Sequence, residues 1–312
     1  MLLPQISVEP TVFSPTGYAH SDVCDAHLTG LKETLLERVL VHDLYEGQLS
    51  QTALKDLPSM SKGREILKKM HQRGRLLAVP KVSRSQPSDG SAWVTEALNS
   101  NKSKPVAGIL ATPPAKAQFA GEALVSDITK RTGSTWWQED VERQSWTVQR
   151  TAHQFLAHLA PLLLHAHSLT LVEPYLDPSD KGYAWLSQLV ELLAKRDRPP
   201  DVLEFHRGHQ EGSGDGRRLF DSQAMSEIFA PIGGALKRHG IRARVVVWHK
   251  MHNRYLLTNL GSFSLGNSLR EERNDTDTWT RLDQKTRTDL HRQYDAEVHT
   301  NRLVYNPIHI GA

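Results

Sequence analysis

The sequence predicts an α/β protein in which a mixed sheet flanked by helices is preceded by a small α-rich N-terminal domain. Three apolar runs, at residues 168–173, 201–206 and 242–248, have the length and β-branched content of buried strands. Segments with helical spacing separate them, at 183–195 and 221–239. Because strands joined through helices need crossover connections, we expect a largely parallel or mixed sheet with helices on both faces.

Length and composition agree with an ordinary globular protein. The 312 residues suffice for two domains, 38% of them are hydrophobic, and the net charge of +3 permits a phosphate-rich partner without requiring one. The single cysteine, Cys24, excludes an intrachain disulfide and a cysteine-built zinc site, and is expected to be a spectator thiol. The first residues lack the basic flank and apolar run of a signal peptide, and no apolar stretch is long enough to span a bilayer. These features predict a cytoplasmic protein without a membrane partner.

The N-terminal domain is expected to span residues 1–135. Leucines recur at helical spacing from Leu28 to Leu40. A short basic helix over 61–75, followed by the apolar run 76–79, resembles the helix-then-wing order of small nucleic-acid-binding domains, although a solvated basic face is the commoner explanation. Only 106–110 is otherwise strand-like. The pattern therefore favours an α-rich domain with a winged-helix-like or docking role.

The second domain, residues 136–312, is expected to contain the sheet. A long helix is predicted over about 137–166, and a helix near 284–293 and a strand over 297–304 are predicted to end the chain. The glycine-rich stretch 208–216 is interpreted as a flexible loop. In open α/β sheets the active site lies beyond the carboxyl ends of the strands. The polar residues that fall near such ends are Glu173, Asp177, His206, His209, His249 and His252.

The segment 245–269 carries the clearest chemical signal. The run Val245–Val247 is followed by a polar cluster and then by a second apolar run beginning at Tyr255, so His252 and Arg254 are predicted on one face of a strand. An imidazole beside a permanent cation suits phosphoryl transfer, because that reaction develops negative charge on the non-bridging oxygens.

This segment resembles the phospholipase D superfamily, whose pattern is His-x-Lys, four residues, Asp, six residues, and Gly-Ser-x-Asn. The matching positions here are His252, Arg254, Asn259 and the block Gly266–Leu269. Arginine replaces lysine, asparagine replaces aspartate, and the last block matches in half. The resemblance covers the second half of the chain and contains one motif, as in the nuclease-like prokaryotic branch of the superfamily.

The resemblance implies a mechanism and a set of site residues. His252, Arg254, Asn259 and Glu297 would be catalytic, with Glu297 resembling the acidic residue that orients the histidine from a neighbouring strand; a solvated glutamate is the competing explanation. Asn267 and Ser268 would bind substrate. No metal and no cofactor is implied. Single-motif relatives take their second histidine from another subunit, so the resemblance also implies a homodimer.

Two further histidines precede the motif. His206 and His209 can be a degenerate first copy of it, with Gly208 where the cation belongs, and we expect them to bind substrate. A zinc site built from His206, His209, His249 and His252 is an alternative, although their spacing is not that of typical ligands.

The sequence therefore predicts a metal-independent phosphodiesterase, most simply a nuclease that acts on DNA or RNA through a phosphohistidine, with a role in prokaryotic antiviral defence by association. The alternative is a catalytically inactive, phospholipase D-like subunit that binds nucleic acid or serves as an adaptor in a larger complex.

Overall fold

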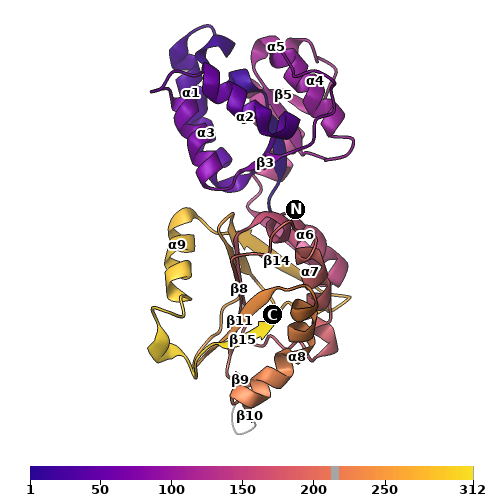
Figure 1. The fold of residues 1–312 in the computed structure, drawn as a ribbon, viewed down its shortest axis with the longest axis vertical. Coiled ribbons are helices and arrows are strands. Elements are labelled where there is room, and N and C mark those ends of the chain that lie inside the picture. The colour runs from indigo at the N-terminus through magenta and orange to yellow at the C-terminus, as the bar shows by residue number, and fades with distance from the viewer. Residues whose placement is uncertain (212–217, 312) are drawn as a thin grey trace. The chain divides into compact units, whose positions relative to one another are not determined.

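The computed structural model describes residues 1–211 and 218–311, and the chain divides into two compact units. One unit spans Leu3–Arg143; the other comprises Met1–Leu2 with Gln144–Ala312. The first holds a parallel five-stranded sheet and the second a mixed eight-stranded sheet, each with flanking helices, which confirms the α/β class (Figure 1). Residues 212–216 of the predicted loop 208–216 lie outside the described residues.

The N-terminal unit is built on five short strands in the order β3-β2-β1-β4-β5, with every neighbouring pair parallel. The strands are β1 Gln5–Val8, β2 Leu40–Asp43, β3 Leu76–Ala78, β4 Gly108–Ala111 and β5 Val125–Asp127. The helices are α1 Ser21–Glu33, α2 Leu44–Asp56, α3 Lys62–Gln72, α4 Gly90–Ser100 and α5 Pro113–Ala117.

Apolar residues cover both faces of this sheet. Leu110 packs into one core with Trp136 and Trp137, whereas its neighbour Ile109 packs into a second core with Trp93. Consecutive strand residues thus enter opposite cores, as expected for a parallel sheet that is covered on both faces.

The winged-helix-like interpretation of this domain is therefore corrected. Residues 76–78 form an edge strand of a parallel sheet, and the basic helix α3 buries Ile66, Leu67 and Met70 in the domain's own core. Its Lys69 pairs with Glu65 on the solvated face. Apart from the run 106–110, which overlaps β4, these strands were not predicted, because three or four residues are too few to show a period.

The expected long helix over 137–166 is also corrected. The chain makes one π-helical turn at Trp137–Val141, forms strand β6 at Ser145–Gln149, and enters α6 only at Ala152–His165. In β6 only Trp146 and Val148 are buried, which is the period of two that a strand requires.

The C-terminal sheet has the order β15-β11-β8-β7-β12-β13-β14-β6. Strands β11, β8 and β7 are mutually parallel, and every other neighbouring pair is antiparallel. The remaining bounds are β7 Ser168–Val172, β8 Val202–Gly208, β11 Arg242–Trp248, β12 Tyr255–Thr258, β13 Ser262–Leu265, β14 Thr276–Arg281 and β15 Ile308–Gly311. A short antiparallel pair, β9 Gln210–Glu211 and β10 Arg218–Leu219, extends beyond β8.

Helices cover the two faces of this sheet. Helices α6, α7 (Trp185–Leu193) and α8 (Ser222–Arg238) lie on one side, and α9 (Gln284–Gln293) lies on the other (Figure 1). On the α9 side, Leu290 and Tyr294 pack with Val172, Val246 and Leu257. The predicted strand 297–304 is absent there; the segment contains a 3-10 turn at Thr300–Arg302, and β15 begins at Ile308.

None of the helices in the described part of the chain combines the length and apolar character needed to cross a bilayer.

Candidate functional site

One edge of the C-terminal sheet gathers the parts of the motif. Parallel strands β7, β8 and β11 end there, antiparallel β12 begins there, and β13 ends there. The loop before β12 therefore brings His252 and Arg254 to the same edge as Asn267 and Ser268, which follow β13. This is the carboxyl edge at which open α/β sheets bind ligands.

Arg254 is held at this edge by a buried carboxylate. Its Nε donates to Oε1 of Glu173 at 3.3 Å, and Glu173 is completely buried just beyond β7. Glu173 also accepts the backbone N–H groups of Tyr175 and Leu269. Burial raises the pKa of Glu173 above its usual value, although the charge of Arg254 and these hydrogen bonds oppose the rise. The guanidinium is partly exposed and lies over the Tyr175 ring.

His252 is exposed in the loop that precedes β12. The prediction that His252 and Arg254 share a strand is corrected, because β12 begins only at Tyr255. Within the described residues the imidazole makes no hydrogen bond or ion pair, so its ring nitrogens face solvent and are accessible to a ligand.

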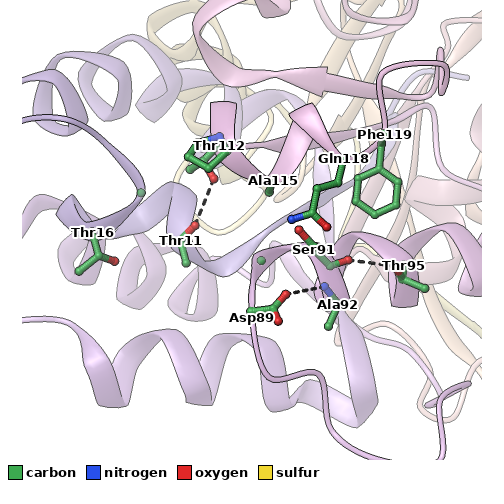
Figure 2. A pocket seen from close by; sticks show the side chains of 13 residues that line it. Thr11, Thr16, Asp89, Ser91, Ala92, Thr95, Thr112, Ala115, Gln118 and Phe119 are labelled. Carbon is green, nitrogen blue, oxygen red and sulfur yellow. Dashed lines mark hydrogen bonds between the residues drawn. The ribbon is translucent and has the colours of Figure 1, made fainter.

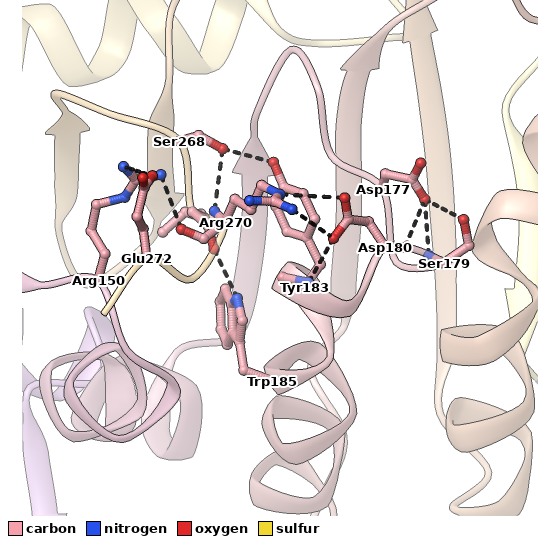
Figure 3. Close-up of polar contacts among 11 residues, drawn as sticks. Arg150, Asp177, Ser179, Asp180, Tyr183, Trp185, Ser268, Arg270 and Glu272 are labelled. Carbon is pink, nitrogen blue, oxygen red and sulfur yellow. Dashed lines mark hydrogen bonds and ion pairs between the residues drawn. The ribbon is translucent and has the colours of Figure 1, made fainter. Parts of the chain in front are cut away.

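The turn after β13 is fixed by its surroundings. Asp277, which is buried, accepts the N–H of Asn267 at 2.7 Å. A Cβ at Gly266 would lie 2.8 Å from the same carboxylate, so glycine permits this approach. The Ser268 hydroxyl lies 2.7 Å from the hydroxyl of Tyr183 (Figure 3). Asn267 itself is exposed, so a rigid turn presents its amide at the edge.

Ion pairs brace the segment that follows this turn (Figure 3). Arg270 pairs with Asp180, and the buried Arg150 pairs with both Glu272 and Asp275. These contacts attach the loop between β13 and β14 to the segment after β7 and to the end of β6.

A pair of histidines lies at the ends of β8 and β11. The rings of His209 and His249 are 5.5 Å apart, and Nδ1 of His209 is 3.3 Å from the carbonyl oxygen of Trp248. His209 is half-buried and His249 is exposed. His209 thus lies at the carboxyl edge of the sheet, and its substrate-binding role stays a prediction.

His206 does not reach this edge, and its predicted substrate-binding role is corrected. Its side chain is completely buried on the α9 side, where Nδ1 accepts from Nε1 of Trp248 and Nε2 lies 3.1 Å from Oε2 of Glu204. Burial lowers the pKa of His206, so the ring is neutral at pH 7 with its proton on Nε2. Both nitrogens are engaged, and His206 cannot join His209, His249 and His252 around zinc.

Asn259 lies at the opposite end of β12, and its predicted catalytic role is corrected as well. Its Oδ1 accepts the N–H groups of His167 at 2.8 Å and Ser168 at 3.2 Å, where β7 begins. Four strand residues separate it from Arg254, which places the two residues about 17 Å apart along the strand. Asn259 therefore aligns β12 with β7.

Glu297 is also removed from the predicted catalytic set. It is exposed outside any strand and accepts from Nη1 of Arg244 at 2.7 Å. Arg244 in turn pairs with Glu204, the partner of His206. Glu297 thus belongs to a polar network on the α9 side of the sheet, beside a cavity of about 340 Å³.

The sequence analysis placed Glu173 near the end of a strand but gave it no role, and it did not identify Tyr183 or Asp277. The available signal for Glu173 was an acidic residue directly after a buried strand and before Pro174, the position at which a sheet presents side chains to a ligand. Tyr183 and Asp277 carry no local signal, because their partners Ser268 and Asn267 lie in the turn after β13, which is 85 residues from Tyr183 and 10 from Asp277.

A second cavity, also of about 340 Å³, opens beside His249. The buried aromatic rings of Trp248 and Tyr294 form its base. Its polar lining residues, all exposed, are His249, Lys250, Gln293, Asn301 and Arg302.

Within ranges 1–211 and 218–311, no three histidine, cysteine or carboxylate side chains are grouped as around a metal ion.

Comparisons with known proteins identify no family. No protein-family model and no curated protein matches the chain. Among solved structures, polyphosphate kinase from Porphyromonas gingivalis is similar over 50% of this chain and 26% of its own, with 12% identity and a TM-score of 0.32. TrmBL2, an archaeal chromatin protein, is similar over 80% of this chain and 84% of its own, with 9% identity and a TM-score of 0.32. The chain thus spans about a quarter of the polyphosphate kinase.

Proposed function

We propose that this protein is a metal-independent phosphodiesterase that cleaves DNA or RNA, with His252 as the nucleophile. The observation that carries the proposal is an exposed imidazole two residues from a guanidinium that a buried carboxylate, Glu173, holds at the carboxyl edge of the sheet. Its association with a prokaryotic defence system belongs to the same proposal.

Arg254 is suited to hold a phosphate. Glu173 engages its Nε, while its two terminal nitrogens make no hydrogen bond within the described residues. Those nitrogens can therefore donate to two non-bridging oxygens at once, the bidentate geometry that distinguishes arginine from lysine. The exposed amide of Asn267 and the hydroxyl of Ser268 supply further donors from the rigid turn.

The reaction proceeds in two balanced steps. A ring nitrogen of His252 attacks phosphorus, a P–N bond forms, the scissile P–O bond breaks, and the leaving oxygen takes a proton from the His209–His249 pair. A water molecule then gives a proton to that pair and attacks phosphorus, which breaks the P–N bond and restores His252. Arg254 stabilises the charge on the oxygens in both steps.

The cavity beside His249 supports a nucleic acid as substrate. Aromatic rings at its base suit a nucleobase, and Lys250 and Arg302 at its rim suit the adjacent phosphates. About 340 Å³ lies within the usual size range of a small-molecule site.

The test is cleavage of labelled single- and double-stranded DNA and RNA in the presence of EDTA. We expect cleavage to persist, and His252→Ala to reduce it by about a thousandfold or more because the nucleophile is lost. His167→Ala is the matched control, since His167 is an exposed histidine at the opposite end of β7. Loss of cleavage in EDTA, or full activity of His252→Ala, would refute the mechanism.

A second candidate is a nucleic-acid-binding subunit of a larger complex that has lost the chemistry. The observation in its favour is that Asn259 and Glu297, which the family resemblance places near the histidine, are engaged elsewhere. Binding that weakens steeply with salt, without cleavage of any of these substrates, would favour this candidate.

A further inference from the structure

The N-terminal unit contains a cavity of about 410 Å³ that the proposed chemistry does not use. It opens between the segment after β1, which supplies Thr11, Thr16 and Gly17, and the segment after β4, which begins at Thr112 (Figure 2). The first turn of α4 forms its third wall.

The topology explains why a cavity forms at this place. The sheet order β3-β2-β1-β4-β5 shows that the chain leaves β1 toward β2 on one side and later adds β4 on the other. The connections after β1 and β4 therefore run to opposite sides and leave a crevice beyond their carboxyl ends. In open parallel sheets this switch point is where ligands bind.

Glu9, directly after β1, holds the two sides of the crevice in place. Its buried carboxylate accepts the N–H of Thr11 at 3.0 Å and both the N–H and the hydroxyl of Thr112 at 3.2 Å. A Cβ at Gly90 would lie 2.5 Å from Oε1 of Glu9, so glycine lets α4 begin against this carboxylate. These contacts fix the walls of the cavity before any ligand enters.

The lining is hydroxylic and lacks positive charge. Among the described lining residues, Asp89 alone carries a charge, and its Oδ1 accepts the N–H of Ala92 at 2.9 Å. The nearby Lys116 donates instead to the carbonyl groups of Phe119 and Glu122. The hydroxyl and amide side chains are Thr11, Thr16, Ser91, Thr95, Thr112 and Gln118.

This chemistry selects a class of ligand. Asp89 at the wall and Glu9 behind it disfavour an anion, because none of the described residues that line the cavity is a cation. Hydroxyl and amide groups can donate to and accept from the hydroxyls of a sugar. The half-buried Phe119 ring provides the apolar surface on which the C–H face of a sugar ring packs.

We propose that this cavity binds the neutral ring of a sugar, either as a free monosaccharide or as the ribose of a nucleoside. The site is separate from the edge that carries His252, and its test does not depend on cleavage.

The test is calorimetric titration of the full chain with D-glucose, D-ribose, adenosine and uridine, with AMP as the charged counterpart of adenosine. We expect saturable binding of at least one neutral compound with a dissociation constant in the range of about 1 mM or tighter. Binding of a monosaccharide identifies the free sugar as ligand, and binding of a nucleoside alone identifies the nucleoside. AMP should bind at least about tenfold more weakly than adenosine, because its phosphate would meet the Asp89 carboxylate and no cation among the described lining residues. No saturable binding, or AMP binding as tightly as adenosine, would overturn the proposal.

Two matched pairs of variants assign any binding to this cavity. Ser91→Tyr fills it and should weaken binding by at least about tenfold, whereas Ser88→Tyr, an exposed serine outside the lining, should not. Gln118→Ala, a milder change that leaves the core intact, should weaken binding severalfold, whereas the exposed Gln72→Ala on α3 should leave it unchanged. His252→Ala should bind as the unaltered protein does, and unchanged affinity in Ser91→Tyr and Gln118→Ala would place the ligand elsewhere and overturn the proposal.

Discussion

At the residue scale, Arg254 and Glu173 have both a structural and a chemical role. The carboxylate is completely buried, and its ion pair with Arg254 is the contact that compensates its charge. Removing one partner of a buried pair costs more than the pair contributes, because the other charge is left uncompensated. Loss of activity in an Arg254 variant alone would therefore not separate unfolding from lost phosphate binding.

A double variant separates the two effects. We expect Arg254→Ala to lower the free energy of unfolding by about 3 kcal/mol, since Glu173 is left buried without its cation. Glu173→Gln combined with Arg254→Ala should recover most of that stability, because no buried charge remains, yet should leave cleavage and phosphate affinity low. Denaturant unfolding and substrate titration measure the two quantities. Recovery of activity together with stability would contradict a direct role for Arg254.

At the element scale, β8 and β11 are joined by side chains as well as by their backbone ladder. Trp248 donates to His206, His206 contacts Glu204, and Glu204 accepts from Arg244, which also holds Glu297. Glu204 and Arg244 are direct partners in the strand register. Although burial alone would raise the pKa of Glu204, contacts with His206 and Arg244 bring it below its usual value.

This network predicts a loss of stability in mild acid. Burial lowers the pKa of His206 in the folded chain. Below about pH 6.5, His206 therefore becomes protonated in the unfolded chain while it stays neutral in the folded chain. The free energy of unfolding therefore falls as the pH drops from about 6.5 toward the lowered pKa of His206. Protonation of the Glu204 carboxylate lowers stability only below about pH 4.3.

The measurement is the denaturant midpoint between pH 7.5 and 5.5. The half-buried His291 has its pKa lowered in the same direction, so the informative quantity is the difference in midpoint shift between proteins. His206→Gln should show a smaller acid-induced shift than the unaltered chain, and the exposed His167→Ala should show the full shift. Equal shifts in all three proteins would mean that His206 is not the responsible group.

At the scale of the whole molecule, the histidine that protonates the leaving oxygen can come from the same chain as His252 or from a second copy of the chain. The His209–His249 pair lies at the same sheet edge as His252, whereas the phospholipase D resemblance implies a second copy of the chain across a two-fold axis.

Mixing inactive variants decides between them. We expect a mixture of the His252→Ala protein and the His249→Ala protein to remain inactive. His252 and His249 belong to one edge of one sheet, so each variant chain lacks one of the two histidines. Restored cleavage in the mixture, together with a dimer in sedimentation, would assign the proton donor to the second copy and support the homodimer.

The amino-acid sequence by itself determined the class and the main strands of the C-terminal sheet. The runs that became β7, β8 and β11 are long enough to show burial without knowledge of their neighbours. The phospholipase D resemblance also grouped the residues before β12 with those after β13, and the structure brings them to one edge because β12 and β13 pair antiparallel.

Only the tertiary structure decided which individual side chains belong to the site. Asn259 lies one strand length from Arg254, and His206 is buried on the α9 side although it lies only three residues from His209. The parallel sheet of the N-terminal unit was not predicted either, because strands of three or four residues are too short to show a reliable period. Glu173 became important through Arg254, 81 residues away, and such long-range pairing depends on strand order and register rather than on local pattern.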